Sequence, residues 1–81
     1  MKNRTFGMWI YKRLHDNNRT QEWLIRRARI SIGSIQRWRK GESPTLGTFL
    51  RVCIVIAKDE RSDIFETIID AIKYSMEDHL A

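Results

Sequence analysis

The segment between Ser31 and Gly41 carries side chains suited to chemistry with another molecule. At the 100° per residue of an α-helix, its outer face presents a small apolar group, an amide and two cations, at Ile32, Gly33, Gln36, Arg37 and Lys40. An amide and a guanidinium form directional hydrogen bonds, and an ammonium attracts anions. These groups suit a DNA groove. The alternative is a polar helix face that only meets water.

The distribution of charge favours an anionic partner for one half of the chain. Residues 1–51 hold 12 Lys or Arg against 3 acids, whereas residues 52–81 hold 3 Lys or Arg against 7 acids. A basic half attracts polyanions through Coulomb forces and counterion release, and an acidic amphipathic half is freer to pack on protein. A solvated basic surface is the alternative reading of the same charge.

The length and the residue types argue against an enzyme. A chain of 81 residues is the size of one small domain, which excludes a two-domain enzyme. His15 and His79 lie at opposite ends without a metal-ligand cluster, no activated nucleophile is evident, and 4 scattered glycines build no phosphate loop. We therefore expect no catalytic residue, no metal, no cofactor and no small-molecule substrate.

Cys53 is the only cysteine, so no internal disulfide can form, and a reducing, cytoplasmic setting is expected. On the inner face of its helix, Cys53 is expected to be a small buried apolar group and not a redox switch. The longest apolar run, Val52 to Ala57, is far below the ~18 residues that span a bilayer. We expect neither a membrane partner nor export.

Apolar residues recur at helical spacing, which predicts an all-α domain of five helices over residues 1–81. The expected helices run from about Thr5 to His15, from Thr20 to the residue before Arg29, from Ser31 to Lys40, from Thr45 to Lys58, and from Ser62 or Asp63 to His79. Gly41 is the expected stop of the third helix. The expected core residues are Phe6, Trp9, Ile10, Leu14, Leu24, Ala28, Ile35, Trp38, Leu46, Phe49, Leu50, Cys53 and Ile56. Trp23 either joins this core or stacks on bases.

The second and third helices are separated only by the three residues from Arg29 to Ser31. So short a turn makes the two helices cross at a steep angle, which is the geometry of a helix-turn-helix over residues 20–41. Ile30 is expected to fill the gap beneath the turn, and Ile35 with Trp38 to anchor the third helix. The outer face of that helix is then left for a partner.

Residues 20–50 resemble the lambda-repressor-like, or Cro-type, helix-turn-helix family. The residues that carry the resemblance are Thr20, Gln21, Glu22, Ile30, Ser31, Ile35, Trp38, Gly41, Pro44 and Leu50. The resemblance implies a five-helix domain whose helix 32–40 enters the major groove and whose dimers read paired half-sites. Members of this family are phage and bacterial transcriptional regulators.

The resemblance also implies roles for individual residues. Ile32, Gly33, Gln36 and Arg37 match base-facing positions, with Arg37 suited to guanine, Gln36 to adenine and Ile32 to a thymine methyl. Gly33 would allow close approach. The implied phosphate contacts are Gln21, Ser31, Arg29, Arg39 and Lys40, and Arg26 and Arg27 could extend this cationic rim.

Three positions depart from the family pattern. Arg29 stands where a glycine is favoured in the turn, and a left-handed backbone there would cost a non-glycine residue about 1 kcal/mol. Ile25 replaces a small alanine, which would widen the spacing of the second and third helices. Arg39 replaces a common acidic residue and adds positive charge.

The last helix, at about residues 62–79, carries an apolar stripe wider than one small core requires. Phe65, Ile69, Ile72 and Met76 recur at intervals of four, three and four residues. We expect this stripe to form a homodimer. The alternative is that the helix folds back and caps the monomer core.

These observations favour a sequence-specific double-stranded DNA-binding regulator, expected to be a repressor, in the cytoplasm of a bacterium or a phage-infected cell. The alternative from another class is a protein–protein interaction module, such as an antirepressor or adaptor, that retains the helix-turn-helix architecture. Single-stranded DNA or RNA binding is disfavoured, because neither a sheet platform nor a row of exposed aromatics is evident.

Overall fold

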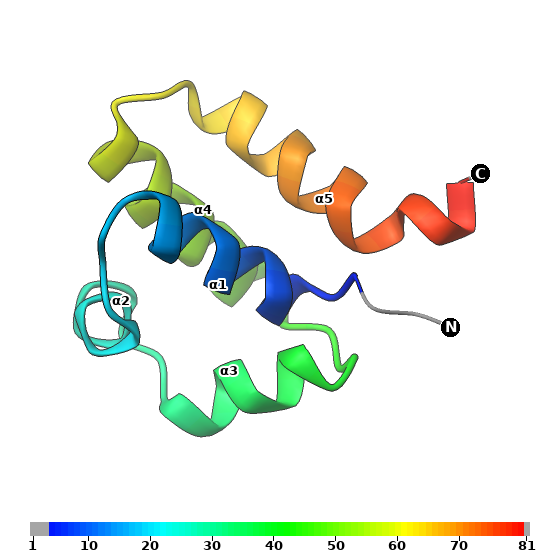
Figure 1. The fold of residues 1–81 in the computed structure, drawn as a ribbon, viewed down its shortest axis with the longest axis horizontal. Coiled ribbons are helices and arrows are strands. Elements are labelled where there is room, and N and C mark those ends of the chain that lie inside the picture. Colours follow the sequence, from blue (N-terminus) through cyan, green and yellow to red (C-terminus); the bar gives the residue numbers. More distant parts are fainter. Residues whose placement is uncertain (1–3, 81) are drawn as a thin grey trace.

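The computed structural model of the protein describes the backbone of residues 4–80 and the side chains of residues 4–75. This part of the chain forms five helices and no strand, which confirms the predicted all-α fold (Figure 1). The helices are α1 (Phe6–Asp16), α2 (Gln21–Ala28), α3 (Ile32–Arg39), α4 (Leu46–Glu60) and α5 (Ile64–Leu80).

Side-chain oxygens mark where each helix begins. The hydroxyls of Thr5, Thr20, Ser31 and Thr45 each accept a hydrogen bond from the backbone N–H three residues later. A carboxylate oxygen of Asp63 accepts from Phe65 N at 2.8 Å. These bonds satisfy amides that have no partner within the first turn. The predicted starts after Thr20, Ser31 and Thr45 are confirmed.

The core is built from apolar side chains of all five helices. Its most enclosed residues are Trp9, Ile10, Leu24, Ala28, Ile35, Val52, Cys53, Ile56 and Ala71, with Phe6, Leu14 and Trp38 nearly as enclosed. The prediction that Leu46 belongs to the core is wrong, because its side chain is 72% exposed. Leu46 is the first residue of α4 and precedes the part of the helix that packs inward. Phe49 and Leu50 are only half-buried.

Helix α1 lies between α3 and α5, which are on opposite sides of the domain (Figure 1). Its approach to α3 is very close, since a Cβ atom added at Gly7 would lie 2.3 Å from the backbone nitrogen of Arg39. The Thr5 hydroxyl joins the same two helices, accepting from Met8 N and donating to the Arg39 carbonyl oxygen at 3.1 Å. Gly7 and Thr5 therefore set the position of the end of α3.

Polar bonds hold α5 against α1. Trp9 Nε1 and Arg13 Nη2 each donate to one carboxylate oxygen of Asp70, at 2.8 Å, and Arg13 also pairs with Glu60 at the end of α4. The hydrogen bond from Trp9, supported by Arg13, lowers the pKa of Asp70 below its ordinary value against the opposing effect of burial. This stabilisation is complete above the unfolded pKa of about 3.9, and it is lost as the pH falls through the lower folded value.

Candidate nucleic-acid interface

The turn between α2 and α3 spans three residues, Arg29 to Ser31, as predicted from the sequence. Figure 1 shows α2 nearly end-on while α3 runs lengthwise across the view, so the two helices cross steeply. Arg29 has φ 58° and ψ 52°, which is the left-handed conformation that favours glycine. Ile30 is half-buried and packs against the core beneath this turn.

Arg51 of α4 supports the left-handed turn. Its Nε donates to the Ala28 carbonyl oxygen at 3.1 Å, and its Nη2 donates to the Arg29 carbonyl oxygen at 3.5 Å. These carbonyls lie at the end of α2, where no further helical turn supplies a donor. Arg51 thus offsets part of the cost of a non-glycine residue at Arg29, and it ties α4 to the turn.

The far end of α3 closes with a glycine. Gly41 has φ +114°, its N–H donates to the Trp38 carbonyl, and the Glu42 N–H donates to the Arg37 carbonyl at 3.1 Å. This pair of bonds is a Schellman motif, which requires a residue of positive φ. The predicted stop at Gly41 is confirmed, and α3 is fixed at both ends.

The outer face of α3 is open to solvent. Ile35 and Trp38 are buried, while Gln36 and Lys40 are exposed and their side chains form no hydrogen bond or ion pair in the described part of the chain. Ile32 is 47% exposed. Helix α5 packs on α1 and α4, on the side of the domain opposite α3, so it does not cover this face (Figure 1). The segment therefore presents an apolar group, an amide and a cation to any partner.

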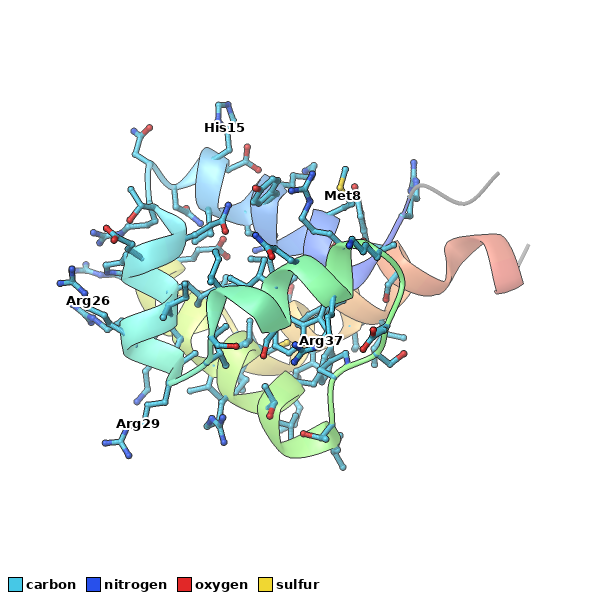
Figure 2. All side chains as sticks on the ribbon, turned by 90° about the horizontal axis from the view of Figure 1, so that it is seen from below. Met8, His15, Arg26, Arg29 and Arg37 are labelled. Atoms are coloured by element: carbon cyan, nitrogen blue, oxygen red, sulfur yellow. The ribbon has the colours of Figure 1, made fainter. Side chains whose placement is uncertain are left out.

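Arg37 shares this outer face, with a side chain that is 56% exposed. Its Nη2 donates to Ser34 Oγ at 3.3 Å, and its Nε lies 3.6 Å from a carboxylate oxygen of Glu42. A Cβ atom added at Gly33 would lie 3.5 Å from Arg37 Nη1, so the guanidinium lies beside the bare backbone of Gly33. Figure 2, which looks onto α3, shows Arg37 on the near side of the domain.

The predicted phosphate-binding residues lie around α3 in different environments. Lys40 and Arg29 are exposed, and Ser31 is exposed with its hydroxyl used as the cap of α3. Gln21 is half-buried at the start of α2. Arg39 is exposed, but its guanidinium lies 4.3 Å from the centre of the Tyr11 ring and donates to the Tyr11 hydroxyl. To contact a phosphate, the Arg39 side chain must either break its contact with Tyr11 or bind the phosphate while it keeps that contact.

A cationic edge formed by α2 borders this face. Arg26 and Arg29 project outward from it in Figure 2, and neither side chain has a hydrogen-bond or ion-pair partner among the described residues. Trp23 lies on the same helix, and the guanidinium groups of Arg19 and Arg27 lie over its ring, 4.7 and 5.5 Å from the ring centre. Trp23 is half-buried and is not a free platform for stacking bases.

The predicted dimerisation residues of α5 are largely uncovered. Phe65, Ile69 and Ile72 are 71%, 53% and 40% exposed, and the side chain of Met76 lies outside the described residues. Ile72 also lines a groove of about 760 Å³ together with Leu46 and Phe49. The inner face of α5 is instead formed by Thr67 and Ala71, which are buried. The stripe of Phe65, Ile69 and Ile72 is therefore not buried in the core of the monomer.

Five residues around α3 have structural roles that the sequence did not reveal. Thr5 and Gly7 position the end of α3, Arg51 holds the turn, and Ser34 and Glu42 contact Arg37. Glu42 follows Arg37 by five residues across a glycine stop, so helical spacing gives no signal for this pair. Ser34 precedes Arg37 by three residues, a spacing at which side chains on a helix meet, and could have been found.

The described part of the chain holds no group of three or more potential metal ligands. No helix among those residues has the length and apolar character needed to cross a bilayer. Burial raises the pKa of the Cys53 thiol to about 12, so this free cysteine is held in its unreactive protonated form.

The fold and this surface define a five-helix all-α domain that exposes one short polar and cationic helix. Comparisons with protein-family models, curated proteins and solved structures found no match for the chain.

Proposed function

We propose that the protein is a sequence-specific double-stranded DNA-binding transcriptional regulator, acting as a repressor, with α3 in the major groove. The observation that carries this proposal is the exposed face of α3, where Gln36, Arg37 and Lys40 lie together within the basic half of the chain. A helix fits the major groove, where guanidinium and amide groups distinguish base edges and an ammonium contacts phosphate.

The steep α2–α3 crossing supports this proposal, since it leaves the outer face of α3 protruding from the domain. Exposed Ile32 is suited to a thymine methyl, and Gly33 lets the backbone approach the bases. Arg29, Arg26 and Lys40 would contact the flanking phosphates. The repressor-like family assignment is part of the same proposal.

Substitutions on α3 separate base contacts from phosphate contacts. We expect Arg37→Ala to weaken binding to a duplex selected from a random library by about 1–3 kcal/mol, with a smaller loss on random duplex. Lys40→Ala should weaken binding to the selected and the random duplex equally. It should also reduce the slope of log affinity against log salt concentration by about 1, since one fewer counterion is released. Titrations of both duplexes at several salt concentrations measure these effects.

Lys73→Ala is the matched control, because Lys73 is an exposed cation on α5, away from α3. It should leave both affinities nearly unchanged. Equal losses on selected and random duplex for Arg37→Ala would contradict its role in base readout. Failure of the wild type to bind any duplex at low salt would contradict the proposed function itself.

The stripe of Phe65, Ile69 and Ile72 supports a homodimer, in which two copies of α3 would reach half-sites about 34 Å apart or a multiple of that distance. Exposed apolar side chains at this spacing are costly unless another surface covers them. Because the DNA would lie in a bacterial or phage-infected cell, we place the protein in the cytoplasm, in keeping with the free thiol of Cys53.

A charged residue in the stripe tests the dimer. Ile69→Lys should raise the dimer dissociation constant by at least about tenfold, because a cation would be buried at the contact. Glu66→Lys is the control, since Glu66 is exposed on the same helix outside the stripe. Sedimentation or light scattering over a concentration series measures the mass. A wild-type protein that stays monomeric at tens of micromolar, with and without DNA, would contradict the dimer.

The exposed stripe and the groove beside Leu46 also favour a second candidate function, an interaction module such as an antirepressor or adaptor. Such a module would use α5 to bind another protein and would not need the cations of α3. A mobility shift on random duplex at low salt distinguishes the two functions. The DNA-binding protein should show salt-sensitive binding, and the interaction module should show none.

A further inference from the structure

The Arg37 guanidinium is held from one side only. Glu42 faces its Nε at 3.6 Å, and the Ser34 hydroxyl accepts one N–H of Nη2 at 3.3 Å. An arginine has five N–H donors, so the two of Nη1 and the second of Nη2 stay available. These donors form the end of the guanidinium, which is an edge that can pair with two acceptors at once.

The position of the guanidinium along α3 also matters. The group extends back toward Gly33 and Ser34, in the first turn of α3, as helical side chains generally do. The first turn is the part of a recognition helix that reaches base edges. The guanidinium reaches the level of Gly33, since a Cβ atom added there would be in ordinary van der Waals contact with Arg37 Nη1, at 3.5 Å.

The backbone of Glu42 is held in place at the end of α3. The Glu42 N–H donates to the Arg37 carbonyl at 3.1 Å within the stop formed by Gly41. The same residue pair is therefore joined by a backbone hydrogen bond and by opposite charges. The backbone of Glu42 therefore stays close to Arg37 whenever α3 is folded to its end, and its carboxylate lies within reach of the guanidinium.

A carboxylate at this place acts differently on the two kinds of acceptor in DNA. The N7 and O6 atoms of guanine are uncharged acceptors, so Arg37 can bind them while it keeps its contact with Glu42. A phosphate is an anion, and it must compete with the Glu42 carboxylate for the same cation and is repelled by it. Penalising the wrong partner in this way raises specificity.

We propose that Glu42, with Ser34, is a specificity-determining positioning residue that directs Arg37 to guanine and away from phosphates. This inference rests on the proposed function. It assigns to the carboxylate a role in discrimination between DNA sequences, beyond its role at the end of α3.

The test compares Glu42→Gln with the wild type on the selected duplex and on random duplex. Glutamine keeps the backbone bonds of the stop and removes the charge. We expect binding to random duplex to tighten about three- to fivefold, within the range for exposed charge pairs, while binding to the selected duplex does not tighten. The ratio of the two affinities should fall by the same factor. Glu42→Asp should retain most of the ratio.

Glu22→Gln is the matched control for net charge. Glu22 is an exposed acid of the basic half, in the first turn of α2, and has no partner among the described residues. Glu22→Gln should change the affinities for the selected and the random duplex by the same factor and leave their ratio unchanged. In an Arg37→Ala background, Glu42→Gln should no longer change the ratio, because the coupling needs both side chains.

Two results would overturn the inference while the proposed function stands. One is an unchanged ratio for Glu42→Gln in a wild-type background that does discriminate sequences. The other is a fall in the ratio that persists without Arg37. A wild type that binds all duplexes equally would overturn the proposed function as well, and it is recognised before any variant is made.

Discussion

Replacing Gly7 by alanine is expected to lower the free energy of unfolding by about 3 kcal/mol or more. The added Cβ would lie 2.3 Å from the Arg39 nitrogen and 2.6 Å from the Arg39 Cα. Both atoms belong to the backbone of α3, so no side-chain rotation can relieve the contact. Helices α1 and α3 would have to separate, and the hydrogen bond from Thr5 to the Arg39 carbonyl would be strained with them.

Gly47→Ala is the matched control for this substitution. Gly47 is also the second residue of a helix that follows a threonine cap, but nothing lies within 4 Å of an added Cβ. Alanine there should be neutral or raise stability by up to about 1 kcal/mol, because it reduces the freedom of the unfolded chain. Urea denaturation of the three proteins, followed by circular dichroism, measures both effects.

The alanine at position 7 should also disturb binding to the selected duplex under conditions where the protein is still folded. The displaced contact is at the end of α3, next to Lys40 and the stop at Gly41. A Gly7→Ala protein as stable as Gly47→Ala would show that α1 and α3 do not approach as closely as described.

Replacing Trp9 by alanine is expected to lower the free energy of unfolding by about 3–5 kcal/mol, the range for truncating a large buried aromatic. Trp9 is 1% exposed, stacks on Phe6 with ring centres 5.6 Å apart, and donates its Nε1 hydrogen to Asp70. Truncation would leave a cavity in the centre of the core and release one bond between α1 and α5. For a domain of this size, such a loss can unfold most of the population.

Phenylalanine at the same position separates the hydrogen bond from the packing. Trp9→Phe should cost about 1–2 kcal/mol, because it keeps an aromatic ring and loses the bond to a carboxylate. Trp23→Phe is the control, since the Trp23 Nε1 is buried without a partner among the described residues. It should cost less than about 1 kcal/mol.

Thermal and urea unfolding of the variants at neutral pH provide the comparison. The difference between Trp9→Phe and wild type should shrink in acid, as Asp70 becomes protonated below its lowered pKa. Equal costs for Trp9→Phe and Trp23→Phe would contradict a stabilising bond to Asp70.

Local rules were enough to predict the helices. The hydroxyl groups of Thr20, Ser31 and Thr45 each accept a hydrogen bond from the backbone N–H three residues later, and Gly41 adopts a positive φ without a steric penalty. Helical periodicity likewise predicted that Ile35 and Trp38 would be buried and that Gln36 would be exposed. These interactions span a few residues, so they can be recognised in a single sequence.

The misplaced Leu46 shows where such rules fail. Its spacing to Phe49 and Leu50 is helical, but the first turn of α4 begins before the helix reaches the core, and the side chain is left outside. Periodicity gives the angle of a residue around a helix and not the place along the axis where a neighbour begins to cover it.

By itself, the sequence determined the five helices, the short turn before α3 and the exposed outer face that the proposed function needs. Only the tertiary structure decided that Gly7 permits the approach to Arg39, that Arg51 holds the turn, that Glu42 faces Arg37 and that Arg39 lies on Tyr11. The physical reason is range. Caps and periodicity depend on neighbours within one or two helical turns, whereas most of these contacts join residues that are adjacent only after the helices have packed.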